Sequence, residues 1–125
     1  PPVRLVKTIG DAAMLVSPDA DALLGATLEL VAAGEAEGDA FPQLRAGVAT
    51  GPALGRAGDW YGSPVNLASR ITAIARPGSV VAAEATRDAA HAERWRWSAL
   101  PPRRLRGVDH AVRLYRVRRR DDDGG

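Results

Sequence analysis

The spacing of apolar residues along the chain predicts a first amphipathic helix soon after residue 17. Leu, Val and Thr side chains recur there at intervals of three and four residues, which places them on one helical face. These positions are Leu23, Leu24, Thr27, Leu28 and Val31. Ser17 and Pro18 predict the start of the helix, with Ser17 as the N-cap and Pro18 in the first turn. Gly34 predicts its end.

A second helix is predicted from Ser63 to about Arg76, with a proline and a glycine directly after it as a stop. Its apolar stripe is formed by Val65, Ala68, Ile71 and Ala75. Asn66 and Arg70 are four residues apart, so they share a helical face at the edge of that stripe.

Alternating apolar and polar positions, together with glycine-containing turns, predict the strands. Residues 3–8 and 12–17 form a hairpin with a tight turn at 9–11, because Gly10 tolerates a positive φ. The other predicted elements are a strand through Leu44, Ala46 and Val48, a second hairpin or bent strand at 51–62, a strand at 79–83, a short helix at 84–92 and a last strand at 112–117. Antiparallel neighbours mixed with helices predict an α+β fold in which the helices pack on one sheet.

Length and composition predict one globular domain and exclude several classes of protein. The chain has 125 residues, of which 46% are hydrophobic and 26% charged, so it can bury a modest core and is too apolar for a disordered chain. It has no cysteine, which excludes a disulfide scaffold, a thiolate metal site and a cysteine nucleophile. The apolar runs are too short for a membrane span and no secretory pattern is present, so we expect a cytoplasmic protein.

The charge is distributed unevenly along the chain. Residues 1–93 carry seven basic and eleven acidic side chains, whereas residues 94–125 carry ten and four. Nucleic-acid binders often have such a basic end. At residues 118–125, however, three arginines adjoin three aspartates and two glycines follow, which favours a disordered charged tail. We therefore expect no nucleic-acid partner.

Three clusters of polar residues are candidates for chemistry. Lys7, the only lysine of the chain, closes the first predicted strand and Asp11 opens the second. Asn66 and Arg70 form the second cluster, where an arginine fork can bind a carboxylate or a phosphate. The third is the basic turn that contains Arg106. On spacing alone, these clusters also fit a weak ion pair in an exposed turn, a helix-surface arginine and a solvated loop.

Taken in order, the clusters resemble the motifs of the class III nucleotidyl cyclase catalytic domain. Residues 7–11 are similar to the family's K-x-x-G-D hairpin, and residues 59–70 to its D-x-[WYF]-G-x-x-V-N-x-A-[SA]-R segment. Residues 105–107 are similar to its L-K-G turn. The likeness is closest to actinobacterial adenylate cyclases whose catalytic domain follows a regulatory region. It implies that residues 1–117 are the C-terminal portion of such a catalytic domain.

The resemblance implies an adenylate cyclase that converts ATP to cyclic AMP and pyrophosphate at the interface of a homodimer. Asp11 would be one of two carboxylates that hold two divalent cations, Mg²⁺ or Mn²⁺. Lys7 and Asp59 would recognise the adenine edge, since a lysine donates to a ring nitrogen and an aspartate accepts from the exocyclic amine. Guanine has a carbonyl in place of that amine, which Asp59 would repel.

The same resemblance implies that Asn66 orients the ribose, that Arg70 stabilises charge on the α-phosphate and that Arg106 meets the terminal phosphates. Asp11 would come from the other protomer. Arg106 departs from the family pattern, because a lysine is usual there. The family's first strand, with an F-x-D metal motif, and its two following helices precede the hairpin and are not among these residues. We therefore expect a ferredoxin-like mixed or antiparallel sheet that lacks them, and a chain that is inactive alone.

Two other hypotheses stay open. A non-catalytic cyclase-homology module, which binds nucleotide or regulates a partner, would account for the absent metal strand. An upstream coding sequence without an F-x-D strand would favour it. Nucleic-acid binding through the arginine-rich end is the third hypothesis, and the absence of salt-sensitive binding to RNA and DNA would remove it.

Overall fold

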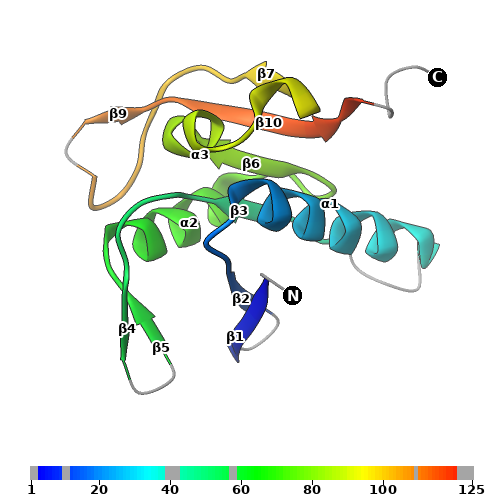
Figure 1. Ribbon diagram of the computed structural model, residues 1–125. Helices are drawn as coiled ribbons and strands as arrows, with labels where there is room; N and C mark the ends of the chain where they lie inside the picture. Colours follow the sequence, from blue (N-terminus) through cyan, green and yellow to red (C-terminus); the bar gives the residue numbers. More distant parts are fainter. Residues whose placement is uncertain (1–2, 10–11, 39–42, 57–58, 109, 121–125) are drawn as a thin grey trace.

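The computed structural model describes residues 3–9, 12–38, 43–56, 59–108 and 110–120. Within them, a four-stranded sheet is flanked by helices, and three two-stranded hairpins lie at its margins (Figure 1). The α-helices are α1 (Ala20–Ala36), α2 (Ser63–Ile74) and α3 (Glu84–Ala89), and a short 3₁₀ helix follows at Ala92–Arg94. No helix in these described ranges has the length and apolar character of a membrane span.

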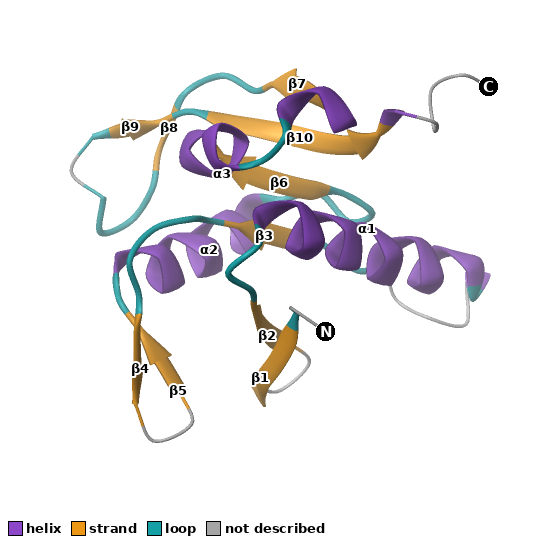
Figure 2. Ribbon diagram, viewed as in Figure 1, coloured by secondary structure: helices purple, strands orange, loops and turns teal. Residues whose placement is uncertain are grey.

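The central sheet contains both parallel and antiparallel neighbours (Figure 2). Its order is β3 (Ala46–Val48), β6 (Val80–Ala83), β10 (Leu114–Arg119) and β7 (Trp95–Ala99). β3 runs parallel to β6, whereas β10 is antiparallel to β6 and to β7. The hairpins are β1 (Arg4–Ile9) with β2 (Ala12–Val16), β4 (Leu54–Arg56) with β5 (Asp59–Tyr61), and β8 (Arg103–Arg104) with β9 (Ala111–Val112). This mixed sheet with packed helices confirms the predicted α+β class.

The two faces of the central sheet bury separate cores, because successive residues of a strand point to opposite faces. On β6, Val80 packs in a cluster with Leu24 of α1, whereas the next residue, Val81, packs with Ile71 of α2. Leu24 and Ile71 are fully buried. Each such side chain contributes about 1.5–3 kcal/mol to folding. The predicted apolar faces of both helices are thus confirmed, and the two helices cover opposite faces of the sheet.

The helices begin and end at positions that differ slightly from the prediction. Asp19, not Ser17, is the N-cap of α1, because its carboxylate accepts a hydrogen bond from the Ala22 backbone N–H at 3.2 Å. Ser17 accepts a hydrogen bond from the Asp19 N–H at 3.0 Å and so stabilises the turn before the cap. α2 ends at Ile74, two residues before the predicted Arg76.

The C-terminal part of the chain has more strand than the sequence predicts. Residues around the two tryptophans, expected to be scattered anchors, form the edge strand β7, and β10 continues to Arg119. Buried Val117 pairs with Trp97, and this register brings Arg118 and Arg119 into the ladder. The Arg119 guanidinium lies 5.9 Å from the Trp95 ring centre and donates to the Gly25 carbonyl at 3.2 Å. The expectation of a tail from residue 118 is therefore wrong at Arg118 and Arg119, and residues 121–125 lie outside the described residues.

The β1–β2 hairpin forms where the sequence predicts it, but it is a two-stranded sheet of its own. Within the described strands, β3 is one end of the central sheet. The β1–β2 and β4–β5 hairpins extend from the same side of the molecule, below α1 and α2 in Figure 1, and β1 contacts β5. This arrangement brings residues 7 and 59, which lie on different hairpins, into one place.

Candidate functional site

The clearest contact between predicted site residues joins Lys7 on β1 to Asp59 on β5. The Lys7 Nζ lies 2.6 Å from the Asp59 Oδ2, across a sequence separation of 52 residues. The side chains are 39% and 24% exposed, so the pair is partly shielded from water. Partial burial strengthens the attraction of opposite charges relative to a fully exposed ion pair. A cationic donor and an anionic acceptor therefore lie side by side where the two hairpins meet.

α2 carries Asn66 and Arg70 on an exposed face, one helical turn apart. The opposite side of this helix holds the buried Ile71 and Ala75, so core packing fixes the direction of the polar face. The helix begins directly after β5 through Gly62, whose φ of 136° is a conformation that other residues rarely adopt. Asp59 and the polar face of α2 are thus connected by one short and sharply bent segment.

The position of α2 is fixed by a close backbone approach to β3. The Gly47 N–H donates to the Thr72 hydroxyl at 2.9 Å, and that hydroxyl donates to the Ala68 carbonyl at 2.8 Å. A Cβ atom at Gly47 would lie 2.4 Å from the Thr72 backbone nitrogen, so the strand and helix can meet only where a side chain is absent. The sequence analysis did not identify Gly47 or Thr72, although a glycine between strand residues is a known sign of close backbone approach.

Arg106 is displayed by a tight turn between β8 and β9. The Val108 N–H donates to the Leu105 carbonyl at 3.1 Å, and Gly107 has a φ of 80°, which together fit a type II turn with Arg106 at its second position. Leu105 is buried in the same cluster as Ile71 of α2. The Arg106 side chain is exposed while its neighbour anchors the turn to the core beneath α2.

The predicted metal ligand, Asp11, lies outside the described residues. Within the described part of the chain, no group of three or more His, Asp or Glu side chains lies close enough to hold a metal ion. The described residues by themselves therefore do not form a divalent-cation centre.

Comparison with known sequences relates the chain to adenylate cyclases. No protein-family model matches it. It is, however, 55% identical over 123 residues to a pH-sensitive adenylate cyclase of Mycobacterium tuberculosis. The alignment covers 95% of this chain but 31% of the relative, so the chain spans less than a third of that protein's length.

Solved cyclase structures have the same fold. The adenylate/guanylate cyclase/hydrolase from Silicibacter pomeroyi matches with a TM-score of 0.80 and 24% identity, over 92% of this chain and 72% of that one. The catalytic core of a rhodopsin-guanylyl cyclase with converted specificity, in complex with ATPalphaS, matches with a TM-score of 0.74 and 25% identity, over 94% and 72% of the two chains. The chain belongs to the class III nucleotidyl cyclase family.

In this cyclase-family chain, the predicted site residues divide into three groups. Lys7 and Asp59 are in direct contact. Asn66 and Arg70 share the exposed face of α2, and the turn that carries Arg106 packs against the core under the same helix. Asp11 lies outside the described residues. The roles implied for these residues stay predictions.

A second polar cluster of the cyclase domain was missed by the sequence analysis. Asp21, in the first turn of α1, is 9% exposed and receives several hydrogen bonds. Its carboxylate accepts from the His91 backbone N–H at 3.0 and 3.1 Å and from the Trp95 indole N–H at 2.8 Å, and the His91 Nδ1 lies 2.5 Å from it. The separations of 70 and 74 residues leave no local pattern that could reveal these contacts.

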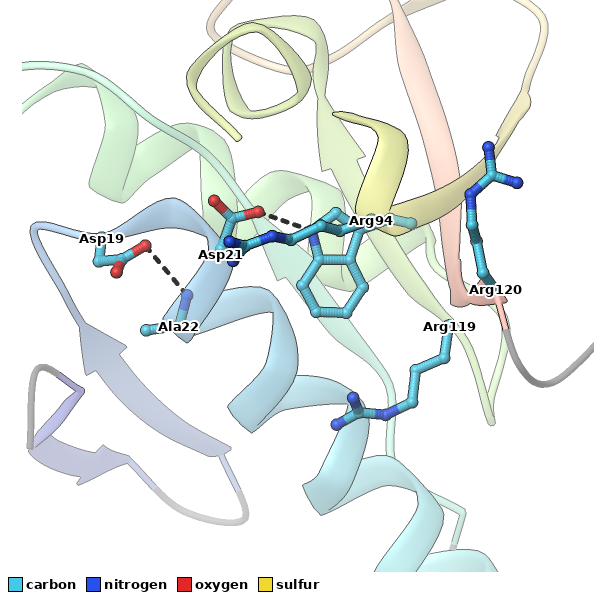
Figure 3. Close-up of a pocket in the computed structure, with 7 residues that line it drawn as sticks. Asp19, Asp21, Ala22, Arg94, Arg119 and Arg120 are labelled. Atoms are coloured by element: carbon cyan, nitrogen blue, oxygen red, sulfur yellow. Dashed lines mark hydrogen bonds between the residues drawn. The ribbon is translucent and has the colours of Figure 1, made fainter. Parts of the chain in front are cut away.

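Asp21 and Trp95 also line an open hollow of about 470 Å³ at the start of α1 (Figure 3). The other lining residues are Asp19, Ala22, Arg94, Arg119 and Arg120. Burial raises the pKa of the Asp21 carboxyl, but the hydrogen bonds from Trp95 and His91 together outweigh that effect, so its pKa lies below the ordinary value for aspartate. The cluster therefore fastens α1 to the segment that leads into β7.

Replacing Asp21 by asparagine is expected to lower the free energy of unfolding at pH 7 by about 1–3 kcal/mol, because hydrogen bonds to a buried carboxylate are weakened. Because the pKa of Asp21 is lower in the folded state than in the unfolded state, its ionised carboxylate stabilises the fold above the unfolded pKa of about 4. This stabilisation is lost as the pH falls through the lower pKa of the folded state. The gap between wild type and variant in urea unfolding should therefore narrow between about pH 4 and pH 2. Asp19→Asn keeps a capping oxygen and is the matched control, with little change expected. A gap of constant size at all pH values would contradict this assignment.

Proposed function

We propose that this chain supplies the nucleotide-binding side of an adenylate cyclase site that converts ATP to cyclic AMP and pyrophosphate. The observation that carries the proposal is the contact between Lys7 and Asp59 at 2.6 Å. The 55% sequence identity to an adenylate cyclase, over 95% of this chain, supports it.

The Lys7–Asp59 pair has the chemistry that the adenine edge requires. The lysine ammonium is a donor only, and the ionised carboxylate is an acceptor only. Adenine presents a ring-nitrogen acceptor beside an exocyclic amine donor, so a side-by-side donor and acceptor complement it. Guanine has a carbonyl oxygen at the place of the amine, and two acceptors would then face each other. We infer that the site prefers ATP over GTP. When ATP binds, Lys7 and Asp59 would exchange their contact with each other for hydrogen bonds to the adenine base.

The polar face of α2 is suited to the ribose and the reacting phosphate. In this proposal Asn66 orients the ribose by hydrogen bonds, and Arg70 stabilises the charge that develops on the α-phosphate as the 3′-hydroxyl attacks. Arg106, in the turn between β8 and β9, binds the terminal phosphates. Its guanidinium fork takes the place of the lysine ammonium that is usual in the family. Because core contacts position α2 and this turn, the donors are held before substrate arrives.

Two divalent cations, Mg²⁺ or Mn²⁺, would be held by Asp11 and by a second carboxylate, which the family resemblance places in an F-x-D strand before the β1–β2 hairpin. When bound, they would neutralise the pyrophosphate leaving group and activate the attacking hydroxyl. We further propose that the complete site lies between two copies of the domain, with Asp11 of one copy facing Arg70 of the other. A regulatory domain upstream would control this assembly.

The proposal is tested by measuring cyclic AMP formation from ATP with Mn²⁺. Residues 1–125 and a version extended through the upstream coding sequence are compared over a series of protein concentrations. We expect activity in the extended form only, with specific activity that rises with protein concentration because the site needs two copies. Asp59→Ala in the extended form should reduce the preference for ATP over GTP, while Asp88→Ala, an exposed change on α3, is the matched control.

An extended form that makes no cyclic AMP over a wide range of protein and metal concentrations would contradict the enzyme proposal. The second candidate function would then be a non-catalytic cyclase-homology module. Binding of ATP without turnover would support that module.

A further inference from the structure

One face of the central sheet carries a concentration of arginines that the proposed active site does not use. Along β10, Leu114 packs in the core beneath α2, and alternation places Arg116 and Arg118 on the same face. Arg118 is paired in register with Arg96 of β7, which therefore shares this face. We call Arg96, Arg116 and Arg118, together with Arg76 just after α2, the arginine face.

The arginine face is left open by the elements that cover the rest of this side of the sheet. α2 packs against β3, β5 and β6, and the β8–β9 hairpin covers the sheet only as far as Leu114 through the buried Leu105 and Val112. Arg116 and Arg118 are only half-buried, and Arg76 and Arg96 are exposed. Among the described residues, these arginines therefore form a basic and at least partly exposed strip across two strands.

This arrangement is unfavourable for the isolated domain. Arg118 and Arg96 are directly opposite each other in the β7–β10 ladder, which concentrates positive charge at this place. The Arg116 Nε is buried and has no hydrogen-bond partner among the described residues. A buried polar group without a partner opposes folding. Apolar or oppositely charged residues at these positions would make the fold more stable.

The charges around Arg116 also make its environment unfavourable for a cation. Burial lowers the pKa of its guanidinium, and the positive charges of Arg118 and Arg76 lower it further. Glu35, at the end of α1, has the opposite effect on the same pKa. The acidic group that acts on Arg116 is thus outnumbered by the basic ones, and the strip attracts further negative charge.

The chemistry of the face distinguishes a protein partner from a nucleic acid. Single-stranded nucleic acids bind to sheets mainly by stacking their bases on aromatic side chains. Here Trp95, Trp97 and Tyr115 alternate with the arginines and lie on the other face of the sheet. Guanidinium forks spaced along strands instead match the carboxylates of an extended acidic chain.

We propose that the arginine face docks an extended acidic segment of a protein partner. The carboxylates of that segment would pair with the guanidinium groups of Arg116 and Arg118. The partner would lie against the sheet beside α2 without covering the Lys7–Asp59 pair, which is on the protruding hairpins.

The test measures the binding of a fluorescein-labelled octaglutamate peptide to residues 1–125 by fluorescence anisotropy, at low and at physiological salt. The double variant Arg116→Gln with Arg118→Gln should bind about tenfold more weakly. Arg103→Gln with Arg104→Gln removes the same charge from the exposed strand β8 and should bind within about twofold of the unaltered chain. A labelled octamer of uridine should bind more weakly than octaglutamate.

A second readout separates docking from folding. Arg116→Met should raise the melting temperature, because it removes a buried group without a partner, and should also weaken octaglutamate binding. Equal loss of binding in the two double variants would overturn the proposal, since it would show only a general effect of net charge. Tighter binding of the uridine octamer would replace the acidic partner by a nucleic acid. A lower melting temperature for Arg116→Met would show that Arg116 serves the fold instead.

Discussion

Replacing Arg70 by alanine is expected to lower the rate of cyclic AMP formation about 100- to 1,000-fold in the active form of this cyclase, since removal of one preorganised donor to developing charge typically has that effect. Arg70 is exposed on α2 whereas the next residue, Ile71, is buried, so the Arg70 side chain can reach a nucleotide and its loss leaves the core intact. The loss should appear in kcat far more than in KM, because the donor acts mainly on the transition state.

The measurement is the steady-state rate of cyclic AMP production over a range of ATP concentrations. Arg70→Lys keeps the charge but loses the guanidinium fork, so an intermediate rate is expected. Arg94→Ala removes an exposed arginine from the 3₁₀ helix before β7 and should leave kcat within about twofold, as expected for an isolated surface charge. If Arg70→Ala changes kcat no more than Arg94→Ala does, the assignment of Arg70 to the reacting phosphate is wrong.

The elements of this fold that could be predicted from the sequence are those with a strong local pattern. The three- and four-residue spacing predicted both long helices, and the structure buries Leu24 and Ile71 at the centres of the expected faces. Turn glycines predicted the first hairpin, and they predicted a hairpin or a bent strand where the structure has the second. The strand β7 was missed although Trp95 and Trp97 alternate with polar residues, which is a strand pattern, and its pairing with β10 establishes it as a strand.

The candidate site shows the same division between local and long-range information. The spacing of Asn66 and Arg70 placed them on one helical face, and the structure agrees. Spacing alone paired Lys7 only with Asp11 in its own turn, whereas the structure brings Lys7 to Asp59 on another hairpin. Nothing local in the sequence specifies a contact over 52 residues. The family resemblance connected these two residues through a shared ligand.

The close approach of β3 and α2 leads to the other large expected effect. Gly47→Ala is expected to destabilise the domain by about 1–3 kcal/mol, because overpacking forces the backbone to move. The new Cβ would lie 2.4 Å from the Thr72 nitrogen and 2.6 Å from the Ala68 carbonyl oxygen, and both are backbone atoms that cannot rotate away. To relieve these contacts, α2 must shift from the sheet, and the hydrogen bond from Gly47 to Thr72 is weakened.

Because the shifted helix carries Asn66 and Arg70, cyclic AMP formation should fall about 100-fold as well, in line with the effect of small displacements on catalytic geometry. Urea unfolding measures the first effect and the steady-state rate the second. Gly25→Ala in α1 is the matched control, since its Cβ would only make an ordinary 3.7 Å contact with Trp95 and alanine favours helix. A Gly47→Ala variant as stable as the Gly25→Ala variant would mean that the tight contact between β3 and α2 does not hold the helix in place.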